Sequence, residues 1–195
     1  EYRYGIVMAD VSGKDVSAAA HIAMCKHSIR VVAEFVDQPS KLLEKMNRVI
    51  YEETEPDKFI SLIYCTLDIR YGGLVYGSAG HDPCLLLKAG YDRAEFIATE
   101  DILLGVLPHA TFSDRSASIK VDDVMLLYTD GVIGALSPEY DEGLARLESA
   151  LREWRSRPAQ EIADNLYRLT VTRFAGGAPD DLALMVLKGL GTEGI

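Results

Sequence analysis

The amino-acid sequence predicts an α+β fold in which pairs of helices cover a β-sandwich. Apolar residues with helical spacing occur in two pairs of segments. Between these pairs lie short apolar stretches at intervals of roughly ten residues, which is typical of antiparallel strands. The 195 residues are 48% hydrophobic and 26% charged. This is the composition of a globular domain whose core is large enough to need no disulfides.

The chain is expected to begin with one strand and two helices. Residues 1–9 form an apolar stretch that predicts a buried strand, and a turn-rich link follows from Asp10 to Asp15. A broad apolar stripe then predicts a long helix from Val16 to about Val36. Pro39 starts a second helix that is expected to end near Thr54.

The remainder of the chain is expected to contain strands, then two helices and a last strand. Six strands are predicted at residues 59–67, 74–79, 84–88, 94–98, 112–120 and 124–129. Helices are expected to begin at Ser137-Pro138 and at Pro158, and a strand at 181–187 precedes a frayed tail. We interpret residues 1–195 as a single domain. The abrupt start predicts that it is excised from a longer protein or lacks its N-terminal strand or strands.

Charge and cysteine content narrow the possible partners and location. The 20 basic and 30 acidic residues give a formal net charge of −10, which disfavours nucleic acid or an anionic membrane as a partner. No signal segment or membrane-inserting stretch is expected. The three cysteines are widely spaced among apolar residues, which favours reduced thiols in the cytoplasm.

Three aspartates lie where strongly apolar strands are expected to end or begin. They are Asp10, Asp130 and Asp180. Each alone is also explained as an ordinary turn, cap or strand-start residue. Carboxylates gathered at one end of a sandwich would repel one another unless a cation neutralised them, and oxygen ligands without histidine or cysteine favour Mg²⁺ or Mn²⁺.

Six short segments have an order and spacing that point to one family. They are Ala9-Asp-Val-Ser-Gly-Lys14, Lys58-Phe-Ile-Ser-Leu-Ile-Tyr64, Ser78-Ala-Gly-His-Asp-Pro83, Leu104-Gly-Val-Leu-Pro108, Leu127-Tyr-Thr-Asp-Gly-Val132 and Pro179-Asp-Asp-Leu-Ala-Leu184. Together they resemble the bacterial branch of the metal-dependent serine/threonine phosphatases (PPM). This branch includes the stage II sporulation phosphatase and the stress-response phosphatases that act on anti-sigma-factor antagonists.

The resemblance implies a four-layer α/β/β/α sandwich of two antiparallel sheets flanked by helix pairs, with a binuclear Mn²⁺ or Mg²⁺ site. Asp10 would be the catalytic residue that bridges the metals and positions the attacking water, and Val11 would contribute its backbone carbonyl. Asp130 and Asp180 would supply the remaining ligands. Asp181 would face away, although a register in which it replaces Asp180 stays open.

The implied function is hydrolysis of phosphoserine or phosphothreonine on a regulatory protein by a metal-activated water, under control of an adjacent sensor domain. The expected substrate is an anti-sigma-factor antagonist. His81 either contacts the rim of the metal site or holds its loop by hydrogen bonds, and Lys14 is a second candidate on the substrate side.

The sequence also departs from the family pattern. The family has an upstream Gly-Gly-Asp segment whose acidic residue supports the second metal, and the printed sequence begins after that point. Ser78 and Asp82 replace two asparagines around His81. Two alternatives therefore stay open: an enzyme domain that binds one metal instead of two, or a catalytically weak or silent pseudophosphatase that acts as a protein-binding signalling module.

Overall fold

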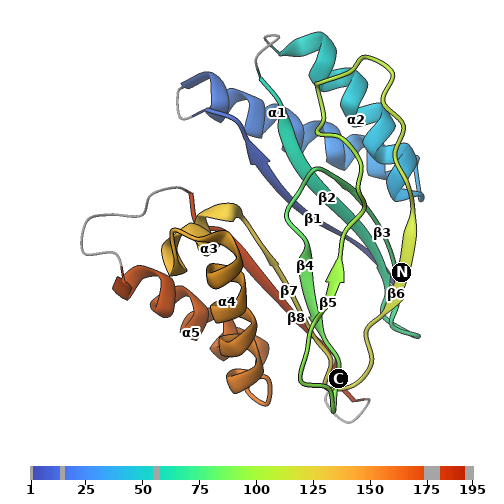
Figure 1. The fold of residues 1–195 in the computed structure, drawn as a ribbon. Coiled ribbons are helices and arrows are strands. Elements are labelled where there is room, and N and C mark those ends of the chain that lie inside the picture. Colours follow the sequence, from blue (N-terminus) through green and yellow to red (C-terminus); the bar gives the residue numbers. More distant parts are fainter. Residues whose placement is uncertain (1, 14–15, 55–57, 174–180, 192–195) are drawn as a thin grey trace. The chain divides into compact units, whose positions relative to one another are not determined.

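The computed structural model describes residues 2–13, 16–54, 58–173 and 181–191. Within these ranges it contains two antiparallel four-stranded sheets and five helices (Figure 1). The predicted α+β class with two antiparallel sheets and accompanying helices is therefore confirmed. The chain divides into two compact units. The first unit comprises Glu1–His81 and Ala98–Ser118, and the second comprises Asp82–Ile97 and Ile119–Ile195.

The sheet of the first unit has the strand order β1-β2-β3-β6. These strands are β1 (Arg3–Val11), β2 (Ile60–Asp68), β3 (Gly73–Ala79) and β6 (Arg115–Ser118). The first strand is longer than predicted, because it continues through Asp10 and Val11 instead of ending before them. The register explains this, since Asp10 pairs with Ser61 and Val11 with Ile60 of β2.

Two helices, α1 (Val16–Ala33) and α2 (Pro39–Glu53), pack on one face of this sheet (Figure 1). The second helix begins and ends where the sequence predicts. Its apolar stripe is fully buried because the positions recur with helical spacing against the sheet. These residues are Leu42, Leu43, Met46 and Ile50. Each such side chain contributes about 1.5–3 kcal/mol of burial free energy.

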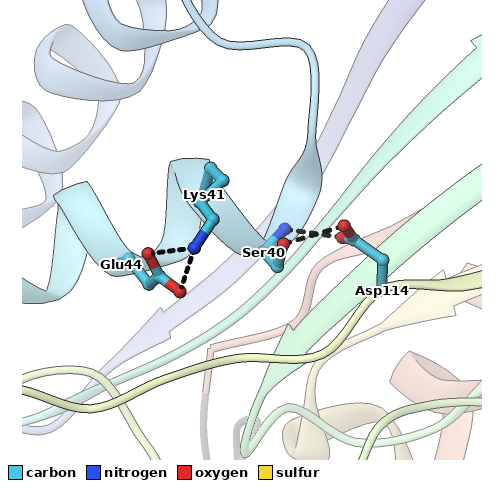
Figure 2. A network of polar contacts seen from close by, with 4 residues as sticks. All are labelled: Ser40, Lys41, Glu44 and Asp114. Atoms are coloured by element: carbon cyan, nitrogen blue, oxygen red, sulfur yellow. Dashed lines mark hydrogen bonds and ion pairs between the residues drawn. The ribbon is translucent and has the colours of Figure 1, made fainter.

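A remote carboxylate holds the first turn of α2. Its N-cap residue, Gln38, makes no side-chain cap hydrogen bond. Instead, the Ser40 backbone N–H donates to Asp114 Oδ1 at 2.7 Å, and the Ser40 hydroxyl donates to Oδ2 at 2.8 Å (Figure 2). The carboxylate thus satisfies one of the free N–H groups of the helix start and carries the charge that this end favours. It also ties α2 to the segment that leads into β6.

The second unit has a sheet of order β5-β4-β7-β8 and three helices. The strands are β4 (Cys84–Leu87), β5 (Glu95–Ile97), β7 (Val124–Tyr128) and β8 (Leu184–Lys188), and the helices are α3 (Asp130–Leu136), α4 (Tyr140–Trp154) and α5 (Ala159–Arg173). A single core of aliphatic side chains joins helices and sheet, and its fully buried members include Leu126, Leu147, Leu151, Ile162 and Leu166.

Several element boundaries in this unit differ from the sequence predictions. The Asp130-Gly131 pair opens the short helix α3 instead of forming only a turn. Helix α4 has Glu139 as its N-cap, while Ser137 caps the end of α3. The last strand starts at Leu184, three residues later than expected. Gly189 is held by backbone hydrogen bonds with Asp122 and Asp123, so the predicted fraying does not begin there.

Burial raises the pKa of two of the three cysteine thiols. Cys25, Cys65 and Cys84 are all buried free thiols. Burial raises the pKa of Cys25 to about 11 and that of Cys65 to about 12. Both thiols therefore stay protonated near neutral pH. Among the described residues, no helix combines the length and the apolar character needed to cross a bilayer.

Replacing Asp114 with alanine should lower the free energy of unfolding by about 1–3 kcal/mol, because two charge-assisted hydrogen bonds to the start of α2 are lost. Glu44→Ala is the matched control, since it removes only the exposed pair with Lys41 on the same helix (Figure 2). That change should cost less than about 0.5 kcal/mol. Urea denaturation measures the free energy of unfolding of both variants. Equal losses of stability in the two variants would contradict the capping role of Asp114.

Candidate active site

Asp10 and Val11 end the edge strand of the first unit, and their side chains lie on opposite faces of its sheet. Val11 is buried in the core beneath the helices, together with Val7 and Ala9. Successive residues of a strand alternate between faces, so Asp10 points to the face away from α1 and α2. Only the backbone of Val11 is therefore suited to ligate a metal, whereas the half-buried Asp10 offers its carboxylate.

His81 is connected to the residue opposite Asp10. Ser61, the β2 partner of Asp10 in the strand register, has its Oγ 2.9 Å from His81 Nδ1. The Ser78 hydroxyl accepts a hydrogen bond from the His81 backbone N–H at 3.3 Å and donates to its carbonyl at 3.4 Å. These bonds hold the loop after β3. Because paired residues project to the same face of a sheet, they also bring His81 close to the strand end that carries Asp10.

In the second unit, Asp130 follows Thr129, and Thr129 is hydrogen-bonded to the chain segment before β8. The Thr129 backbone N–H donates to the Ala183 carbonyl at 3.0 Å, and its hydroxyl donates to the Asp181 carbonyl at 2.9 Å. The Ala183 N–H in turn donates to the Thr129 hydroxyl at 3.0 Å. The backbone of Asp181 therefore lies beside the exposed Asp130 at the start of α3. Asp180 and Lys14, two of the predicted site residues, lie outside the described residues.

A second carboxylate, Asp82, interacts with Asp130 in the same unit. In the sequence, Asp82 stands where the family pattern has an asparagine. Burial, which is the largest effect, raises the pKa of Asp82, and the negative charge of Asp130 also raises it. The hydrogen bond from the Tyr140 hydroxyl, at 3.0 Å, lowers this pKa, but the pKa is raised overall. A divalent cation near Asp82 and Asp130 would compensate their negative charge.

Asp123 shows how a purely structural carboxylate of this unit differs. Burial raises its pKa, but hydrogen bonds from the backbone N–H groups of Lys120 and Ala89, together with the Lys88 ammonium, outweigh this effect and lower the pKa overall. Asp123 is thus stabilised in its charged form by surrounding donors. Among the described residues, Tyr140 donates a hydrogen bond to Asp82, and Asp130 is a negatively charged neighbour that raises its pKa.

The donor residues are distributed over both units. Asp10, Val11 and His81 belong to the first unit, whereas Asp82, Asp130 and Asp181 belong to the second. Considering only the part of the chain that the structure describes, no three or more histidine, cysteine or acidic side chains are arranged to hold a metal ion. Each unit by itself therefore holds part of the predicted ligand set.

The sequence profile of the family described as stage II sporulation protein E (SpoIIE) matches residues 1–189. The chain belongs to the SpoIIE family. This match confirms the resemblance that the six short segments indicated, and it assigns the chain to the PP2C-type phosphatase domains, the group to which the bacterial PPM phosphatases belong.

Known members of this group are similar over most of the chain. Phosphoserine phosphatase RsbU of Bacillus subtilis (strain 168) is 25% identical over 183 residues, which are 94% of this chain and 55% of RsbU. The crystal structure of the RsbU and RsbW domains of Rv1364c from Mycobacterium tuberculosis is 25% identical with a TM-score of 0.85, covering 97% of this chain and 52% of that one. The chain thus spans about half the length of these two relatives.

A third similarity concerns the fold alone. The crystal structure of RsbX in complex with magnesium has a TM-score of 0.72 at 16% identity, over 95% of this chain and 81% of that chain. It shows that the two chains share this fold.

Replacing Asp82 with asparagine should stabilise the metal-free protein above about pH 4. The raised pKa means that the folded state disfavours the ionised Asp82 carboxylate. Ionised Asp82 therefore destabilises the fold as the pH rises above about 3.9, the pKa of an aspartate in the unfolded chain. Asp123→Asn is the matched control with the opposite sign. Because the pKa of Asp123 is lowered, its ionised carboxylate stabilises the fold above the unfolded pKa, and this stabilisation is lost as the pH falls. Urea unfolding from pH 3 to 8 measures both, and a D82N variant less stable than wild type at pH 7 would contradict this account.

Proposed function

We propose that the chain is the phosphatase domain of a metal-dependent phosphoserine/phosphothreonine protein phosphatase. The observation that carries the proposal is the SpoIIE family match over residues 1–189, in a chain that retains an acidic residue at each of the three candidate positions. The similarity to a phosphoserine phosphatase over 94% of the chain supports the same reaction class.

The proposed metal ligands are Asp10, the Val11 carbonyl, Asp130 and Asp180, binding two Mn²⁺ or Mg²⁺ ions, or one in this chain alone. This assignment takes its residues from both units. Three observations support it: the donors are hard oxygens, Asp130 already disfavours a second negative charge on Asp82, and RsbX has been crystallised with magnesium. Bound divalent cations would supply a water molecule acidic enough to react near neutral pH and would neutralise charge on the phosphoryl group.

The chain's own residues would hold and orient these partners. Asp10 is positioned by the β1–β2 register, and the residue after Val11 closes the strand end: the Ser12 N–H donates to the Phe59 carbonyl, and the Phe59 N–H donates to the Ser12 hydroxyl. Ser12 therefore acts in positioning Asp10. In the second unit, the bonds of Thr129 to residues 181 and 183 would hold Asp181 beside Asp130.

The proposed substrate is a phosphorylated regulatory protein, and we propose an anti-sigma-factor antagonist. An adjacent sensor domain is proposed to control the reaction, and the matched region covers 55% of the length of RsbU. A cytoplasmic location is part of the proposal and agrees with three buried free thiols. No nucleic acid or membrane partner is proposed, since the net charge of −10 opposes both.

Asp10→Asn and Asp130→Asn should each lower Mn²⁺-stimulated hydrolysis of a phosphoserine peptide roughly 100-fold or more, since a neutral amide neither balances nor bridges cations as a carboxylate does. Phosphate release measures the rate, and calorimetry measures Mn²⁺ affinity, which should fall in both variants. Asp92→Asn, in an exposed loop of the second unit, is the control and should keep both.

The same assays separate the two acidic neighbours before β8. Asp180→Asn should lose Mn²⁺ affinity, whereas Asp181→Asn should retain it; the reverse result would place Asp181 in the ligand position. Full activity in the Asp10 and Asp130 variants would refute the metal-dependent mechanism. A wild type that binds a phosphoprotein but neither metal nor substrate phosphate would identify a pseudophosphatase.

A further inference from the structure

A lysine ammonium lies against the turn that follows Asp10. In the first unit, Lys58 Nζ is 2.8 Å from the position that a Cβ on residue 13 would occupy, and residue 13 is glycine. Gly13 has a φ of +105°, a conformation that favours glycine. The missing side chain therefore serves two purposes: it permits the turn, and it leaves the space that the ammonium fills.

The backbone around Lys58 is tied directly to the end of β1. The Ser12 N–H donates to the Phe59 carbonyl at 3.1 Å, and the Phe59 N–H donates to the Ser12 hydroxyl at 3.0 Å. Lys58 precedes Phe59 and Ser12 lies two residues after Asp10. These reciprocal bonds consequently hold the lysine next to the residues that carry the proposed metal-bridging carboxylate.

A second contact supports Lys58 from the loop after residue 103. Ile60 and Leu104 exchange backbone hydrogen bonds of 3.1 and 3.0 Å. A Cβ on Gly105 would lie only 3.3 Å from the Lys58 carbonyl, so the two backbones are in close contact. The nearly fully buried Asn47 of α2 then fixes the loop, because its amide accepts from the Gly105 N–H at 2.9 Å and donates to the Leu107 carbonyl at 2.8 Å.

A cation at this position answers an electrostatic need of the proposed reaction. The chain carries a net charge of −10, and a phosphoserine side chain brings about two further negative charges. An ammonium has three donors for phosphate oxygens, and such charge-assisted bonds are stronger when the group is partly shielded from water. Lys58 is half-buried, and its backbone is held on two sides.

We propose that Lys58 is a substrate-binding residue whose ammonium contacts the phosphoryl group of the phosphoserine substrate. The inference rests on the proposed phosphatase function and adds a residue on the substrate side of that site. It also assigns a role to Gly13, which keeps the turn after Asp10 open for the lysine head group.

Lys58→Gln should raise KM for a phosphoserine peptide and the inhibition constant of inorganic phosphate by about tenfold or more, with a smaller effect on kcat. The Mn²⁺ dissociation constant, measured by calorimetry, should stay within twofold of wild type. Lys58→Arg should restore much of the phosphate affinity because it restores the charge. Lys45→Gln, at an exposed position of α2 in the same unit, is the control and should change none of these values.

Unchanged KM and phosphate inhibition in the Lys58→Gln variant would overturn the inference while leaving the phosphatase function intact. A loss of Mn²⁺ affinity as large as the loss of phosphate affinity would also overturn it, since the lysine would then act only by shaping the Asp10 turn. A wild type without Mn²⁺-stimulated activity would refute the proposed function instead. In that case, calorimetry compares the affinity for inorganic phosphate of the Mn²⁺-loaded wild type and the Mn²⁺-loaded Lys58→Gln variant. Phosphate binding that is tenfold weaker in the variant supports the role of Lys58, and equal binding overturns that role.

Discussion

The register between β1 and β2 is the constraint on which the first half of the site depends. It sets Asp10 opposite Ser61, and a slip of one residue would turn the Asp10 side chain toward the core under the helices. The same pairing brings Ser61 to His81 and leaves Ser12 to bond with Phe59 where the strands separate. One ladder of backbone hydrogen bonds thus positions the carboxylate, the histidine loop and the lysine beside Gly13.

The second unit uses a side-chain hydroxyl for a comparable purpose. Thr129 bonds to the chain at residues 181 and 183, which joins the end of β7 to the approach to β8. In the same unit, burial raises the pKa of Asp82, and the negative charge of Asp130 adds to this effect.

The sequence predicted correctly those elements that are determined by residues close together in the chain. The second helix was predicted correctly because Pro39 and four buried apolar positions determine it within fifteen residues. Helix α3 was missed because Asp130-Gly131 is also a turn signal, and its burial against α4 and α5 decides between the two. The delayed start of β8 has a similar origin, since residues 181 and 183 bond to Thr129 outside the strand ladder.

The sequence by itself determined the α+β class, the family and the residue types of the proposed metal ligands, because these depend on short motifs and on the periodicity of apolar residues. Only the tertiary structure revealed Asp82 beside Asp130, Asp114 at the start of α2 and Lys58 against Gly13. Each of these pairs is separated by more than forty residues of chain. Such contacts depend on strand register and on turn geometry, which local sequence patterns do not encode.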